Sequence, residues 1–284
     1  MPPLKYSPVL VRSSSQKAAL RNSVVEDLEM ATTTAVPPAA PEPQPQMSAI
    51  GRIVGVFFSP GATFKDLVQR PSWMAPMILL IVIWFGLCAT LVKRADWVTY
   101  TKQQIEKNKF AASHIEALPE DQKEAAYQQG AQRSKISQYV RGVIGWPLLI
   151  LFSAAINFAA FKLIGGVRTN FGTAFAITAF AHLPMSLREL LAIPVTFLKD
   201  PQSIDPQNFL ASNPAAFLGD SAPAWQLIFF GSLDIFAIWA IILMAVGFSA
   251  ADPKKAPIGK ALGIAFGTTF SIVLLFTMMA WIFL

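Results

Sequence analysis

The sequence has little of what most catalytic and metal sites are built from. Its 284 residues include one cysteine and two histidines, and 14% of them are charged, compared with about 25% in an ordinary soluble domain. The lone cysteine, Cys88, excludes a disulfide within the chain and is interpreted as a small packing residue. His114 has no second histidine, cysteine or carboxylate at ligand spacing. We therefore predict no metal site.

The motifs of the common enzyme classes are also missing. The sequence contains no phosphate-binding loop of the Gly-x-x-x-x-Gly-Lys-Ser/Thr type, no His-Glu-x-x-His, no paired cysteine motif and no Gly-x-Ser-x-Gly elbow. Two equal halves, of the kind that inverted-repeat transporters have, are not apparent either. We predict that the protein is not an enzyme and that it has no catalytic residues and no bound cofactor.

Long hydrophobic runs, by contrast, fill most of the chain. A helix needs ~20 mostly apolar residues to cross ~30 Å of hydrocarbon, and five runs of 20, 22, 28, 26 and 24 residues reach that length. They are Trp73–Val92, Val143–Ile164, Phe171–Leu198, Trp225–Ala250 and Ala261–Leu284. The sequence therefore predicts an all-α, polytopic integral membrane protein, in which residues 73–284 form a five-span domain embedded in the lipid bilayer.

Two segments precede the first run. Residues 1–47 are rich in Ser, Thr, Ala, Pro and Gln, a composition that cannot bury enough apolar surface to fold. We predict a disordered tail there, with a partner-binding arm as the alternative, and find no apolar core typical of a cleaved signal peptide. Residues 48–72 mix apolar and charged side chains around Pro60-Gly61, which predicts a pair of amphipathic helices at the membrane interface.

Residues 93–142 form a long hydrophilic insert between the first and second runs. The insert carries nine Lys or Arg and six Asp or Glu. Residues 96–110 and 119–140 are both interpreted as helices, the second because Pro119 and the acidic residues after it suit the first turn of a helix. We expect a short helical hairpin outside the bilayer.

The charges of the short loops predict the orientation. Loops 165–170 and 251–260, with the adjacent Lys162, carry five Lys or Arg, whereas the opposite loop 199–224 carries one. Because cytoplasmic loops hold the excess of Lys and Arg, the tail and these two loops are predicted to be cytoplasmic, although the positive residues of the insert favour the other orientation. Orientation and lipid headgroups explain the net charge of +6, so no nucleic-acid partner is predicted.

Ionisable residues interrupt the third and fourth runs. The third contains His182, Pro184 and Arg188, and the fourth contains Asp234. Pro184 has no N–H and predicts a kink. With a rise of 1.5 Å per residue, Asp234 lies roughly 13 Å and His182 roughly 16 Å from the ends of their spans, so the two are expected to meet, with Arg188 and Glu189 nearer the outer interface. This polar centre is either a structural contact between helices or a relay for protons or ions.

Four small residues recur at every fourth position at the start of the fifth run. They are Gly259, Gly263, Gly267 and Ser271. The spacing places them on one face of a helix, where two backbones can approach closely. Two uses stay open: packing against another span of the same chain, or contact with a second copy in a homo-oligomer.

Four short motifs keep a characteristic order along residues 50–284. They are Phe58-Ser59-Pro60-Gly61-Ala62-Thr63-Phe64, Arg70-Pro71-Ser72-Trp73, Ala181-His182-Leu183-Pro184 and Asp234-Ile235-Phe236-Ala237-Ile238-Trp239. In their order and spacing the chain resembles the Yip family of Ypt/Rab-interacting five-span membrane proteins, and its bacterial members in particular. The insert after the first run is similar to that of bacterial relatives, which implies the cytoplasmic (inner) membrane of a bacterium.

The resemblance implies a cytoplasmic N-terminus, membrane-embedded partners and, for eukaryotic members, a role in vesicle traffic with Rab GTPases. We therefore expect a non-enzymatic scaffold or adaptor linked to membrane organisation or trafficking. The alternative is a small transporter or channel that uses His182 and Asp234, and an intramembrane enzyme comes third. A conduit needs a hydrated path to Asp234, whereas a scaffold needs a dry, packed pair.

The loop charges make a prediction about sidedness. In a Cys88→Ala background, one cysteine placed in the tail and one placed at Ser203 are expected to react with a membrane-impermeant thiol reagent from opposite sides of the membrane. The measurement is labelling of intact and of opened cells or vesicles. Labelling of both cysteines from the same side would contradict the five-span arrangement.

Overall fold

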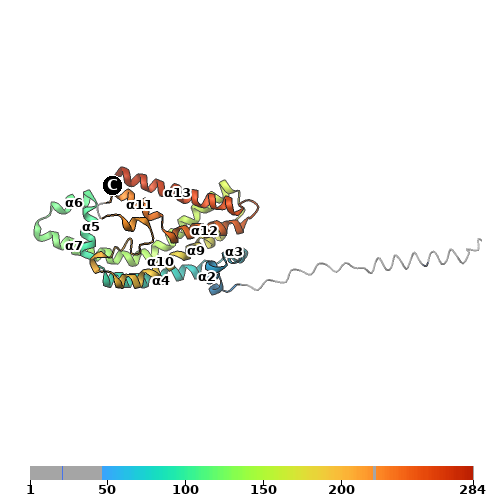
Figure 1. Cartoon of the computed structure of the whole chain (residues 1–284), viewed down its shortest axis with the longest axis horizontal. Helices are drawn as coiled ribbons and strands as arrows, with labels where there is room; N and C mark the ends of the chain where they lie inside the picture. Colours follow the sequence, from blue (N-terminus) through green and yellow to red (C-terminus); the bar gives the residue numbers. More distant parts are fainter. Residues whose placement is uncertain (1–20, 22–46, 220–221, 284) are drawn as a thin grey trace, which may run out of the picture. The chain divides into compact units, whose positions relative to one another are not determined.

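The computed structural model describes residue 21, residues 47–219 and residues 222–283. Every regular element in these residues is a helix, which confirms the predicted all-α class. The predicted disordered tail, residues 1–47, lies outside the described residues except for residues 21 and 47. Figure 1 shows the order of the helices from blue to red along the chain.

Four helical segments are long and apolar enough to cross a membrane, and a fifth is present if one bent pair counts as a single span. The four are α4 (Met74–Arg94), the continuous helix 120–165, the pair α9 (Phe171–Ala181) and α10 (Leu183–Leu198), and α13 (Ile258–Phe283). The bent pair is α11 (Ala224–Ser232) and α12 (Ile235–Ala251), whose axes differ by 51°. The structure thus agrees with a polytopic helical membrane protein of four to five spans.

The sequence led us to expect that the insert and the second span are separate elements, but in the structure they share one helix. Helix α7 (Glu120–Val140) continues through a π-helical turn at Arg141–Gly145 into α8 (Trp146–Ala160), and a second π turn ends the helix at Gly165. No residue between 140 and 146 breaks the helix, because the wider π turn precedes Pro147 and accommodates its missing N–H. Half of the predicted hairpin is therefore an extension of a span.

The rest of the insert forms two short helices, α5 (Trp97–Glu106) and α6 (Lys109–Glu116). Asp96 caps α5, and its carboxylate accepts hydrogen bonds from the backbone N–H and the hydroxyl of Thr99 at 3.0 and 2.8 Å. These donors lower the pKa of Asp96, since they stabilise its charged form. An exposed ion pair between Lys102 and Glu124 joins α5 to α7 at 3.4 Å.

The first described helices, α2 (Ala49–Phe58) and α3 (Pro60–Gln69), form the expected amphipathic pair, with the break at Ser59. The Arg52 side chain is buried between the two helices. Its Nε lies 2.6 Å from the Asp66 carboxylate, and one terminal nitrogen donates to the Arg70 carbonyl and the Ser72 hydroxyl. The location of this pair at a membrane interface stays a prediction.

The connections between spans gather at two ends of residues 47–283 (Figure 1). Loops 165–170 and 252–257 lie together at one end, which we call the loop end: the Arg168 N–H donates to Asp252 at 3.2 Å, and the Lys260 ammonium donates to the Gly165 carbonyl at 2.9 Å. The Arg168 N–H also lowers the pKa of Asp252. Helices α5 and α6, the described part of 199–223 and the end of α13 lie at the other end, the insert end.

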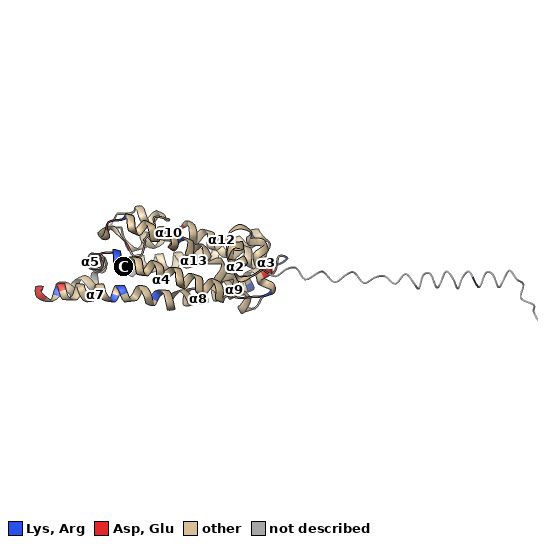
Figure 2. Cartoon of the chain, turned by 90° about the horizontal axis from the view of Figure 1, so that it is seen from below, with Lys and Arg blue, Asp and Glu red and all other residues tan. Residues whose placement is uncertain are grey.

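Charged residues follow the same division. Figure 2 shows Lys, Arg, Asp and Glu mostly toward the two ends of the helices and few along their middle parts. Helix α9 and helix α12 contain no charged residue. The distribution suits helices whose middle parts lie in hydrocarbon and whose ends meet water and headgroups.

The third span occupies the centre of the bundle. In the most apolar stretch of Phe171–Leu198, 61% of residues are buried, compared with 11% in α13. Regular helix is interrupted at His182, two residues before Pro184, where a kink was predicted. At the loop end Phe64 of α3 is fully buried in this core, against the position where Gly247 of α12 passes α9.

The small-residue face of α13 does not pack against another span within the described chain. A Cβ atom added at Gly259, Gly263 or Gly267 would meet no atom within 4 Å. Helix α13 instead buries Ala261, Ile264 and Ala265 on a different face. Of the two uses left open by the sequence, packing within the chain is therefore not what these glycines do, and contact with a second copy stays a hypothesis.

The surroundings of Gly247 and Gly263 differ, and they predict different effects of the same glycine-to-alanine substitution on stability. Gly247→Ala places a methyl group against the Ile177 side chain and 3.0 Å from the Phe64 ring, and overpacking of this kind costs about 1–3 kcal/mol. Gly263→Ala is the matched control, and it is expected to keep stability or raise it by up to about 1 kcal/mol, because its methyl group meets no atom and alanine favours a helix more than glycine does. Thermal unfolding in a mild detergent measures both. Equal effects of the two substitutions would contradict the close contact of α3, α9 and α12.

Candidate functional site: a buried ion pair below a polar vestibule

Asp234 ends one helix and begins the next. The sequence placed it in the middle of a continuous fourth span, but the structure breaks that span at Leu233 and Asp234. One carboxylate oxygen caps α12 by accepting hydrogen bonds from the N–H groups of Phe236 and Ala237 at 2.9 and 3.3 Å. The first N–H groups of a helix have no partner within it. A carboxylate next to them therefore stabilises a helix start, and the fourth apolar run bends at this position, which its length and composition alone did not predict.

The other oxygen of Asp234 lies among donors from two further segments. Arg188 of α10 places its Nε 3.0 Å from this oxygen, and the exposed fractions of the two side chains are only 13% and 6%. The Ser212 hydroxyl donates to the same oxygen, and the Asn213 amide lies 3.5 Å away. The carboxylate is thus held by a cation and four hydrogen-bond donors, as a buried charge requires.

Arg188 is held along one edge of its guanidinium group. The Nε atom also donates to Ser212 at 3.2 Å, and the guanidinium carbon lies 4.5 Å from the centre of the Phe209 ring. Neither terminal nitrogen donates to another residue in the hydrogen bonds of the described chain. Among the described residues the two NH₂ groups thus have no hydrogen-bond partner, on a side chain that Asp234, Ser212 and Phe209 hold in place.

The structure does not bring His182 to Asp234. The His182 Nδ1 atom lies 2.8 Å from the Thr178 carbonyl, and its ring packs edge-to-face on Trp146 at 6.5 Å. His182 and Arg188 are six residues apart, which is about 9 Å along a helix and leaves the two side chains on different faces. The estimated depth of Asp234 also assumed an unbroken fourth span. Of the predicted polar centre, Arg188 and Asp234 form a pair and His182 stands apart.

Sequence reasoning missed the contributions of segment 199–219. Ser212, Asn213 and Phe209 precede Asp234 by more than twenty residues, and only the turn signal Asn213-Pro214 marked their neighbourhood. Glu189 is 1% exposed, and its Oε2 has no hydrogen-bond partner in the described residues. Its expected location nearer the outer interface stays a prediction.

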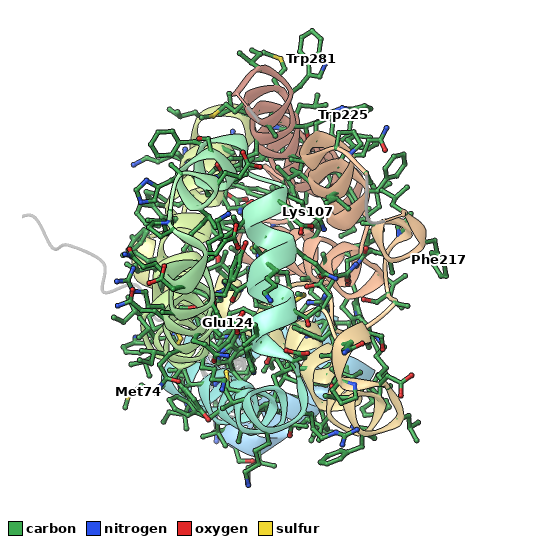
Figure 3. All side chains as sticks on the ribbon, turned by 90° about the vertical axis from the view of Figure 1, so that its left-hand side faces the viewer. Met74, Lys107, Glu124, Phe217, Trp225 and Trp281 are labelled. Carbon is green, nitrogen blue, oxygen red and sulfur yellow. The ribbon has the colours of Figure 1, made fainter. Side chains whose placement is uncertain are left out.

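A cavity of about 600 Å³ opens over the ion pair at the insert end. We call it the vestibule. Its described lining includes Lys107, Arg188, Lys199, Asp205, Asn213 and Asp234. Figure 3 looks onto this end, with Lys107 labelled near the middle of the view and Phe217 and Trp225 toward its edge. Polar side chains are thus concentrated on one side of the ion pair.

The groups that line the vestibule are charged and polar side chains next to apolar ones. In the part of the chain that the structure describes, no group of three or more His, Cys, Asp or Glu could hold a metal ion. The buried carboxylate of the vestibule is already paired with Arg188. The expectations of no cofactor and no catalytic residue stay predictions.

The fold and this site define a class, the polytopic helical membrane proteins. Within it, the family model described as Yip1 domain matches residues 54–282, and the chain belongs to that family, as the sequence motifs had indicated. Membrane protein YknW of Bacillus subtilis (strain 168) is similar, with 23% identity over 227 residues that cover 80% of this chain and 88% of that protein. No solved structure matches the chain.

The ion pair predicts a non-additive effect of two substitutions. Arg188→Met leaves a buried carboxylate without its cation, and loss of one partner of a buried pair costs about 3–5 kcal/mol. In an Asp234→Asn background, Arg188→Met should cost far less, because no stranded charge remains and asparagine still caps α12. Thermal unfolding of the four proteins in detergent gives the coupling energy.

His182→Leu serves as the control for that cycle. Because His182 contacts Thr178 and Trp146 and not the ion pair, its effect should be the same in the wild-type and Asp234→Asn backgrounds. Strong coupling of His182 to Asp234, together with none between Arg188 and Asp234, would contradict the arrangement described above.

Proposed function

We propose that this protein is a non-enzymatic adaptor or scaffold of the bacterial inner membrane, with its loop end in the cytoplasm, that holds membrane-embedded partners. Membership of the Yip1 domain family supports this role. The short-loop charges support the orientation, because loops 165–170 and 252–257, which carry the excess of Lys and Arg, lie at one end.

The observation that carries the proposal is the closed floor of the vestibule. Below Arg188 and Asp234 toward the loop end, α9 and α12 contribute an apolar, fully buried core that includes Ile177, Phe180 and Phe248. The Phe248 ring stacks on Phe161 at 4.1 Å. Core packed in this way leaves no room for the polar lining and water that ions need to cross hydrocarbon. A dry, packed floor favours a scaffold over the alternative, a transporter or channel.

Reconstitution into liposomes separates the two functions. Wild-type protein with a proton or cation gradient and a pH-sensitive or ion-sensitive dye inside is expected to show no more flux than empty liposomes. The Asp234→Asn variant should behave in the same way. A flux that wild type supports and Asp234→Asn abolishes would overturn the adaptor and establish a transporter that uses the polar centre.

Cross-linking in the native membrane tests the adaptor role directly. A photoreactive amino acid at Gly267, on the open small-residue face of α13, is compared with one at Phe276, which is 55% exposed on the same helix. An adaptor that uses this face should give one defined protein adduct, or a dimer of this chain, from Gly267 and only lipid adducts from Phe276. The same adducts from both positions would count against a specific partner on α13.

A further inference from the structure

The vestibule has more positive than negative charge among its described lining residues. Lys107, Arg188 and Lys199 contribute three cations, and Asp205 and Asp234 contribute two carboxylates. Asp234 is already engaged by Arg188, Ser212 and the first turn of α12. The excess charge and the committed carboxylate leave a cavity that attracts anions.

Arg188 is placed to act as the anion receptor. Its Nε edge is bound to Asp234 and Ser212, and its plane is held against the Phe209 ring, so that its rotamer is set before any ligand arrives. A guanidinium group has five N–H donors in a fixed fork that matches the two oxygens of a carboxylate or phosphate. Because the folded protein already fixes the position of the guanidinium group, the Arg188 side chain loses little further conformational freedom when an anion binds.

Two lysines widen the same site toward the insert end. Lys199 lies at the end of α10, where its ammonium donates to the Phe209 carbonyl at 3.3 Å, and Lys107 follows α5. Both line the vestibule. Their long, flexible side chains carry positive charge into the same cavity as Arg188. Arg188 and these two lysines thus place three cations around one cavity, which favours the binding of an anion.

The size and the remaining walls describe the body of the ligand. A volume of about 600 Å³ lies within the range of sites for small molecules, which is ≈ 300–1,000 Å³. Met185, Leu218, Leu227 and Ile228 supply apolar surface next to the charged groups. The walls therefore suit a compact apolar group attached to the anionic head.

From these observations we propose that the vestibule is a binding site for a small organic anion, with its carboxylate or phosphate on the free edge of Arg188 and its apolar body against α11. The site opens at the insert end, and it is separate from the partner contacts of an adaptor. A bound anion would add a bridge between α10, segment 199–219 and α11, and would stabilise the folded protein by mass action.

Calorimetric titration of the full chain in lipid nanodiscs tests the site with four probes of the same size. Benzoate and phenyl phosphate carry the anionic head, whereas benzyl alcohol and benzylamine keep the ring without it. The two anions are expected to bind saturably and to raise the unfolding temperature, and the alcohol and amine are not. Comparison of benzoate with phenyl phosphate then shows which head the site prefers.

Three variants locate the binding. Arg188→Lys keeps the charge next to Asp234 but loses the fork, and it should weaken anion binding about tenfold or more. Lys199→Gln should weaken it less and leaves the ion pair intact, so it reports on the site even where Arg188→Lys unfolds. Lys102→Gln is the matched control, since Lys102 faces Glu124 outside the vestibule, and it should not change binding.

The proposal has clear contrary results. No saturable binding of either anion would overturn it, and so would binding of benzylamine or benzyl alcohol as strong as that of benzoate. If Arg188→Lys and Lys199→Gln change anion binding no more than Lys102→Gln does, the anion binds elsewhere. That result would also overturn the proposal. None of these results bears on ion flux through the bundle, so the site and the adaptor role fail separately.

Discussion

The pairing of Arg188 with Asp234 is the constraint on which the insert end depends. Charged groups inside a membrane bundle are stable only with a partner of opposite charge and satisfied hydrogen bonds. Asp234 obtains both by ending α11 and beginning α12, which bends the fourth apolar segment by 51°. Segment 199–219 then folds back over the break and contributes Ser212 and Asn213 to the carboxylate. The vestibule is the space that this bend and this return leave open.

Different interactions surround the two ends of the bundle. At the loop end, the α2–α3 pair places Phe64 against Gly247, and the surrounding core is apolar and tightly packed. The buried Arg52–Asp66 pair holds the two short helices together at 2.6 Å. The insert end also has an apolar core, which includes Leu91, Trp97 and Tyr100, and it has polar groups and a cavity beside that core. A packed loop end joined to an insert end with a polar cavity is consistent with the proposed binding at one end.

Particular residues show where sequence reasoning succeeded and where it could not. Runs of apolar residues identified the helical class and a membrane protein of several spans, and Pro184 marked the interruption at His182. The same reasoning separated the insert from the second span, because hydropathy changes at Arg141 while the helix does not end there. It also paired His182 with Asp234 by depth alone, although depth says nothing of which helix face a side chain occupies.

By itself the sequence determined that this protein lies in a lipid bilayer. The lengths and compositions of the apolar runs require helices that cross the bilayer, and the loop charges favour one orientation of those helices. The sequence motifs also indicated the family whose model matches residues 54–282. Only the tertiary structure decided that Asp234 would meet Arg188, that Ser212 would reach it from more than twenty residues away, and that the glycines of α13 would stay open. These outcomes depend on how whole helices rotate and bend against one another. Packing between distant segments sets that arrangement, and the pattern of apolar residues within one segment does not reveal it.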